Sequence, residues 1–243
     1  MAATLSAALS AAEGTPAPCV AAVAHKSEVS VLAMRPDGDV VASADEASIH
    51  LWSVAKGTLL KTLTGDPPGS DVSALAFTPD GATLMSATGN GTVKLWRMPE
   101  GTLATTFSAH GDGLGEIAIG AAGTLLATGT TDAHGRSTIG LWALPDGRPL
   151  KTIAGDRVLH ALAFTPDGKT LISAGNDNLI HLWSVPDGTP LRTLDNTEFV
   201  SALVLSSDGG RLVSGGWDGS LRLWSLPAGT LLATRSAHKG VVN

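Results

Sequence analysis

The chain has 243 residues, of which 43% are hydrophobic and 16% charged, so there is enough apolar material for a folded core and intrinsic disorder is excluded. The formal net charge is −6, and the sequence has no basic stripe of the kind that nucleic-acid-binding proteins carry. Its apolar runs are far shorter than the roughly 20 residues of a membrane-spanning helix. We therefore expect neither a nucleic acid nor a membrane as partner.

The chain begins with an Ala- and Ser-rich segment, residues 1–16, that lacks the basic start and the apolar stretch of a secretory signal. We expect a loose tail at 1–16 and one folded domain over 17–243. Cys19 is the single cysteine, which excludes an internal disulfide and favours a reducing, cytoplasmic compartment.

The main signal is an internal repeat marked by Leu-Trp. The dipeptide occurs at 51–52, 95–96, 141–142, 182–183 and 223–224, so five of the six tryptophans are 41 to 46 residues apart. Each unit holds four short apolar or alternating runs separated by tight turns, which is typical of four antiparallel strands. The units end near 54, 98, 144, 185 and 226. Because one such sheet cannot cover both of its apolar faces, the pattern predicts sheets stacked around an axis.

In its period, its strand count and its terminal tryptophan, the sequence resembles the WD-repeat (WD40) β-propeller family over 17–243. The resemblance implies a structural tetrad in each blade: a His before the first strand, a Ser or Thr in the second strand, an Asp in the following turn, and the Trp. The matching residues, unit by unit, are His25, Ser43, Asp45 (or Glu46) and Trp52; Ser86, Asn90 and Trp96; His110, Thr128, Asp132 and Trp142; Ser173, Asp177 and Trp183; Ser214, Asp218 and Trp224. Gly-Asp at 65–66 and 155–156 departs from the family's Gly-His and weakens the tetrads that follow.

The expected fold is thus all-β: a WD40-type propeller with five complete four-stranded blades and partial strands at both ends, at 18–24 and 237–243. Three interpretations of the ends remain open. The chain is a fragment of a longer protein, or an open arc that a partner or a second copy completes, or a compact closed ring of five blades. An open arc would expose the apolar faces of its end blades.

The sequence shows no catalytic constellation, and we expect no enzyme activity, no cofactor and no metal site. His50 and His181 lie two residues before a Trp in equivalent third strands, which indicates repeat packing. The segment 132–135 contains Asp132 and His134 but lacks partners at metal-ligand spacing.

Partner binding is expected on the face that carries the loops between fourth and first and between second and third strands. The loops at 65–71 and 131–137 are longer than their counterparts, and Trp217 is the one tryptophan outside the repeat register. Neutral loop variation and local packing of Trp217 are the alternatives. The candidate binding residues are Trp217, Phe199, Glu198, Pro67, Pro68 and His134.

These features favour a non-catalytic scaffold or adaptor for proteins or peptides. The alternative is a propeller segment of a larger multidomain regulatory protein or enzyme.

Overall fold

The computed structural model of the chain describes residues 25, 27–46, 48–64, 71–111, 114–155, 157–226 and 228–242. The predicted tail at 1–16, the front fragment at 18–24, and Pro67 and Pro68 lie outside these residues. Within the described part, the secondary structure consists of strands, and no helix is long and apolar enough to cross a membrane.

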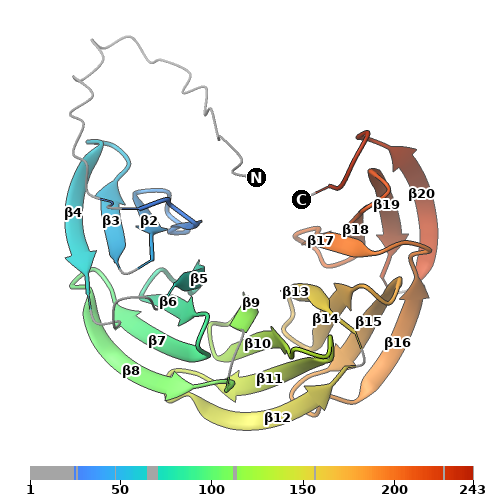
Figure 1. The fold of residues 1–243 in the computed structure, drawn as a ribbon, viewed down its shortest axis with the longest axis horizontal. Coiled ribbons are helices and arrows are strands. Elements are labelled where there is room, and N and C mark those ends of the chain that lie inside the picture. Colours follow the sequence, from blue (N-terminus) through green and yellow to red (C-terminus); the bar gives the residue numbers. More distant parts are fainter. Residues whose placement is uncertain are drawn as a thin grey trace.

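Twenty strands form five antiparallel four-stranded sheets, called blades 1 to 5, each with its strands in chain order from the inside of the arc to the outside (Figure 1). Their bounds, blade by blade, are β1 (Val31–Met34), β2 (Val40–Ala44), β3 (Ile49–Ser53), β4 (Thr58–Leu63); β5 (Val72–Phe77), β6 (Thr83–Thr88), β7 (Thr92–Arg97), β8 (Thr102–Ser108); β9 (Leu114–Ile119), β10 (Leu125–Thr131), β11 (Ser137–Ala143), β12 (Arg148–Ala154); β13 (Leu159–Phe164), β14 (Thr170–Gly175), β15 (Leu179–Ser184), β16 (Pro190–Asp195); β17 (Val200–Leu205), β18 (Arg211–Gly216), β19 (Ser220–Ser225), β20 (Thr230–Ser236).

The turns of each blade follow from their sequence. In the β5–β6 turn, Gly81 has a φ of +68°, and its amide donates to the Thr78 carbonyl at 2.8 Å. The Asp80 carboxylate accepts from the Thr78 hydroxyl and from the Ala82 amide, so the Pro-Asp-Gly sequence closes the hairpin with its own groups. These hydrogen bonds also hold the pKa of Asp80 below its usual value, although burial acts in the opposite direction.

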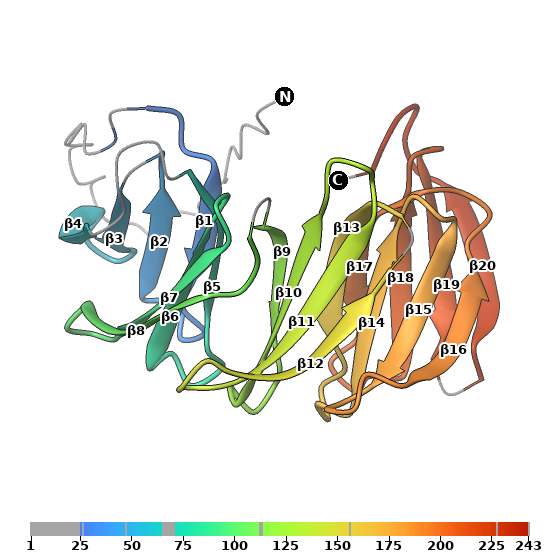
Figure 2. The same ribbon diagram turned by 60° about the horizontal axis from the view of Figure 1, so that its bottom comes forward.

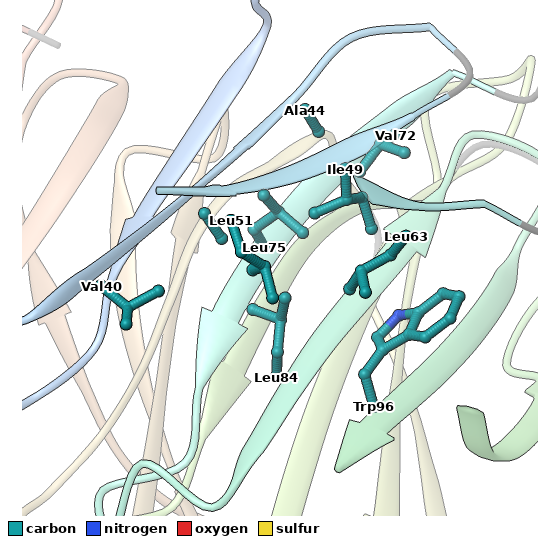
Figure 3. Packing of buried hydrophobic residues seen from close by; sticks show 10 residues of the cluster. Val40, Ala44, Ile49, Leu51, Leu63, Val72, Leu75, Leu84 and Trp96 are labelled. Carbon is teal, nitrogen blue, oxygen red and sulfur yellow. The ribbon is translucent and has the colours of Figure 1, made fainter. Parts of the chain in front are cut away.

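The core lies between the blades, where the face of one sheet packs on the face of the next. Between blades 1 and 2, Ile49 and Leu51 of β3 meet Leu75, Leu84 and Trp96 of the second sheet (Figure 3). Three further clusters of this kind join blades 2 and 3, blades 3 and 4, and blades 4 and 5. Each interface buries apolar side chains that a lone sheet would leave in water.

The blades form an open arc (Figures 1 and 2), because the first and last sheets do not meet. The inner strands β1, β5, β9, β13 and β17 contact one another in succession along the chain. On β1, Leu32 is 54% exposed and Met34 is 61% exposed, whereas Leu75, in the register position of Leu32, is 8% exposed. The closed five-bladed ring is therefore wrong for this structure, because four interfaces join neighbouring sheets and the first sheet does not pack on the last.

The predicted start of a sixth unit is partly visible. The amides of Ala237 and His238 donate to the Gly219 carbonyl, as those of Ala109 and His110 donate to Gly91. Beyond them, the Val242 amide donates to the Gly216 carbonyl at 3.2 Å. The chain end therefore repeats the path that leads into an inner strand.

Candidate functional site

An indole–hydroxyl hydrogen bond, buried in blades 2 and 5 and partly buried in the others, links the second and third strands of every blade. The Ser or Thr of the second strand pairs with a residue of the third strand, and the Trp follows that residue by two positions. Because side chains alternate along a strand, the Trp and the hydroxyl lie on the same face of the sheet. The indole Nε1 donates to Ser43 at 2.7 Å from Trp52, Ser86 at 2.9 Å from Trp96, Thr128 at 2.8 Å from Trp142, Ser173 at 2.8 Å from Trp183 and Ser214 at 3.0 Å from Trp224.

A third side chain joins this pair in blades 1, 3 and 5, and it comes from the residue 18 positions before the hydroxyl. His25 Nε2 lies 2.6 Å from Ser43, and His110 Nε2 lies 2.8 Å from Thr128. In blade 5 the residue is Asn196, whose Oδ1 accepts from the Ser214 hydroxyl at 2.7 Å. The sequence analysis missed Asn196, although the constant spacing of 18 residues would have found it.

The acidic members of the expected tetrads are arranged differently. Only in blade 1 does the carboxylate approach the histidine, with His25 Nδ1 3.1 Å from Asp45 Oδ2, a short electrostatic contact without hydrogen-bond geometry. In blade 2, Asn90 Oδ1 accepts from the Thr88 hydroxyl. The Asp or Asn at this tetrad position thus recurs in the sequence, but its contact with the tetrad histidine does not recur in the structure.

In blades 3 to 5 the carboxylate pairs with a side chain four residues later, because both belong to the same hairpin. The pairs are Asp132–Arg136 at 2.9 Å, Asp177–His181 at 2.6 Å and Asp218–Arg222 at 2.9 Å. In unit 3, a contact between His110 and Asp132, which the resemblance implies, is therefore not found among the described residues, and units 4 and 5 offered no tetrad histidine to Asp177 and Asp218. Burial alone would raise the pKa of Asp218, but hydrogen bonds from Ser220 and Arg222 lower it to about 2.

The structure gathers His25, Asp45 and His50, whose potential ligand atoms all lie within 4.8 Å of one another. The ring nitrogens already have neighbours, since His25 meets Ser43 and Asp45 while His50 lies 3.2 Å from Ser48 and 2.9 Å from Thr62. The His25 and His50 rings also pack edge to face, with centroids 4.2 Å apart. This set of contacts fits side-chain packing better than an ion site.

Trp217, Phe199 and His160 form an aromatic cluster at the loop-bearing edge of blades 4 and 5. The Trp217 ring lies 5.6 Å from Phe199, edge to face, and 5.7 Å from His160. The Trp217 amide donates to the Phe199 carbonyl at 3.1 Å, which fixes the β18–β19 turn against the loop before β17. Trp217 nevertheless remains 44% exposed, so a large apolar surface is available. The predicted proximity of Phe199 and Trp217 is confirmed.

The other binding candidates are dispersed. Glu198 is exposed beside Phe199, and its carbonyl accepts from the Asn196 side chain at 3.0 Å. His134, with its side chain 80% exposed, belongs to the β10–β11 loop of blade 3. That loop reaches towards blade 4, where the Thr131 hydroxyl accepts from the Leu159 amide.

A pocket of about 690 Å³, which the sequence analysis did not predict, lies next to the aromatic cluster, between blades 3 and 4. Its apolar wall includes Ile139, Ile153 and Phe199, and Ser173 with Trp183 lines it from blade 4. Asn176, Asp177, Asn178 and His181 supply polar groups.

Glu116 of β9 is a second feature that the repeat pattern did not indicate. It lies beside Gly129, close to Leu159 and Leu162 of blade 4. Burial among these groups raises the pKa of Glu116 to about 7.

Comparisons with known proteins agree with this architecture. The family model described as "WD domain, G-beta repeat" (WD40) matches residues 18–53, 57–97, 147–184 and 188–225, more than half of the chain. The chain therefore belongs to the WD40 family of β-propellers. The stretch 98–146, which holds β8 of blade 2 and strands β9 to β11 of blade 3 with the longer β10–β11 loop, lies outside the matched segments.

Two curated relatives are similar to part of the chain. The small ribosomal subunit protein RACK1y of Oryza sativa subsp. japonica is 28% identical over 97 residues, 40% of this chain and 28% of that protein. The periodic tryptophan protein 2 homolog of Dictyostelium discoideum is 28% identical over 175 residues, 64% of this chain and 19% of that protein. The matches thus span less than a third of either relative.

A solved structure titled "Crystal Structure of Mitotic Checkpoint Complex" contains a chain with the same fold. The superposition has a TM-score of 0.76 and 23% identity, and covers 86% of this chain and 64% of the other.

The Ser or Thr hydroxyl that bonds to the indole in each blade is expected to stabilise the fold in proportion to the number of buried groups that it pairs with. Replacing Ser214 by Ala removes the partner of both the Trp224 indole N–H and the Asn196 carboxamide oxygen, whereas Ser173→Ala affects only the Trp183 indole. We expect Ser214→Ala to lose about 1–3 kcal/mol more unfolding free energy than Ser173→Ala, measured by denaturant titration. Equal losses would contradict the assigned role of Asn196.

Stability should also depend on the protonation of Glu116. Its carboxyl has a higher pKa in the folded chain, about 7, than in the unfolded chain, so the folded state gives up stability as pH rises from about 4.5 to 7. At pH 8 we expect the unfolding free energy of Glu116→Gln, measured by denaturant titration, to exceed that of the unchanged chain by on the order of 1–3 kcal/mol. The difference should shrink towards pH 4. The exposed Glu28→Gln is the control, and a pH-independent effect of Glu116→Gln would refute the burial argument.

Proposed function

We propose that the chain is a non-catalytic scaffold that binds a protein or peptide through the aromatic cluster of Trp217, Phe199 and His160. The observation that carries this proposal is the exposure of Trp217, which is held in place by two neighbouring rings and a backbone hydrogen bond. A rigid, exposed aromatic side chain binds with little loss of conformational freedom, and such residues are frequent hot spots at interfaces. WD40 membership supports a role in protein interaction.

The absence of a catalytic role is part of the proposal. Asp177 and Asp218, whose pKa values are lowered, are paired with His181 and Arg222 in the same hairpins and so contribute to local structure. The single cysteine supports a reducing, cytoplasmic setting for this scaffold.

The binding role of Trp217 can be tested with a peptide selected from a display library against the full chain. We expect Trp217→Ala to weaken binding of that peptide at least about tenfold, measured by titration calorimetry, with an unchanged thermal unfolding midpoint. The matched control is Leu103→Ala, a residue of similar exposure on the outer strand β8. Equal effects of the two substitutions would refute the site, and unfolding of Trp217→Ala would make Trp217 a structural residue.

The open ends of the arc form a second candidate surface, and we propose that a partner or a second copy covers them. Leu32 and Met34 support this proposal, because they are exposed on blade 1 at positions that face a neighbouring blade elsewhere in the arc. We expect light scattering to give a mass above the 24.6 kDa of one chain, and Leu32→Ser with Met34→Ser to reduce it. A monomer before any substitution would argue against a second copy.

A further inference from the structure

The pocket between blades 3 and 4 lies at a position where the chain elsewhere places a side chain three times, with His25, His110 and Asn196. Gly155 precedes Ser173 by 18 residues, the same spacing as Asn196 before Ser214. The backbone also corresponds, since the Gly155 amide donates to the Ser137 carbonyl as the Asn196 amide donates to Asn178. Gly155 therefore takes the position of Asn196 without supplying its carboxamide.

The missing side chain leaves the Ser173 hydroxyl incompletely paired. Ser173 is buried and accepts from the Trp183 indole at 2.8 Å, and among the described residues no acceptor for its own hydrogen is found. The equivalent hydroxyls of Ser43, Thr128 and Ser214 each meet an imidazole nitrogen or a carboxamide oxygen. The pocket thus offers a buried hydroxyl whose counterparts in three other blades meet an imidazole nitrogen or a carboxamide oxygen.

A buried acceptor lines the same pocket. The Oδ1 atom of Asn178 is shielded from solvent and has no hydrogen-bond partner in the described structure. Buried polar atoms of this kind are rare, because each unpaired group costs about 1–3 kcal/mol. A ligand that fills the pocket gains by pairing with the Ser173 hydroxyl, while Asn178 adds a second polar residue to the pocket wall.

We propose that this pocket binds a planar, uncharged side chain that carries both an acceptor and an N–H donor, namely the imidazole of histidine or the carboxamide of asparagine or glutamine, from a bound polypeptide. The chain itself supplies the template, since His25, His110 and Asn196 carry these groups in blades 1, 3 and 5. Phe199 lines the pocket and also belongs to the aromatic cluster, so one bound segment can contact Trp217 and enter the pocket. This inference rests on the proposed function and specifies the chemistry of the partner.

The experiment uses free imidazole and acetamide as probes of the full chain labelled with ¹⁵N. The indole N–H resonance of Trp183, assigned with Trp183→Phe, reports on the pocket because it is bonded to Ser173. We expect a saturable shift of this resonance with a dissociation constant on the order of millimolar, as suits so small a ligand. Pyrrole, of the same size with a donor and no acceptor, should give no saturable shift.

Two variants test the position of the site. A Cβ at Gly155 would lie 2.2 Å from the Ser137 hydroxyl oxygen, so Gly155→Asn is combined with Ser137→Ala to restore the missing carboxamide. We expect the double variant to abolish the shift and Ser137→Ala alone to retain it. Ser173→Ala should weaken binding at least about tenfold.

The proposal is overturned if imidazole and acetamide leave Trp183 unaffected, if pyrrole matches them, or if the double variant still binds. Because these probes need no partner, such results would leave the scaffold role of Trp217 standing. Conversely, if Trp217→Ala binds the peptide as tightly as the unchanged chain while imidazole still binds in the pocket, only the scaffold proposal is overturned.

Discussion

Each sheet of this chain can bury its apolar side chains only against the neighbouring sheet, and this face-to-face packing determines the rest of the structure. Leu84, Leu126, Leu171 and Leu212 occupy equivalent positions in blades 2 to 5 and are fully buried. Blade 1 has no preceding sheet in the arc, and its inner strand exposes Leu32 and Met34. The same packing rule thus explains both the solid interior and the exposed end.

The packing places a polar network inside an apolar interface, where a hydroxyl left without a partner costs free energy. The Trp–Ser or Trp–Thr bond is constant, whereas the third residue is a histidine in blades 1 and 3, Asn196 in blade 5, and Gly155, which has no side chain to offer, before blade 4. Where the partner is Gly155, the interface is hollow instead of filled. Variation within a repeated framework therefore creates one distinctive site without disturbing the fold.

The repeat made the blades predictable, because the spacing of Leu-Trp and the turn sequences report strand positions directly. The contacts of Asp132, Asp177 and Asp218 were not predictable from the family pattern, because a residue four positions later in the same hairpin competes for each carboxylate. The pocket and the partly buried Glu116 were missed since both depend on side chains from two different blades. The proximity of Trp217 to Phe199 was inferred correctly from neighbouring loops, while its contact with His160 was not foreseen.

Hydrogen exchange of the six indole N–H groups, followed by NMR after transfer into D₂O, is the most direct test of the repeated blades. It shows whether five indoles are hydrogen-bonded inside equivalent blades while the sixth is exposed to solvent. We expect slow exchange at Trp52, Trp96, Trp142, Trp183 and Trp224, whose indoles all donate to a Ser or Thr hydroxyl. Trp217, which is exposed in a turn, should exchange fastest. Rapid exchange at the five repeat positions, or protection of Trp217 equal to theirs, would contradict this expectation.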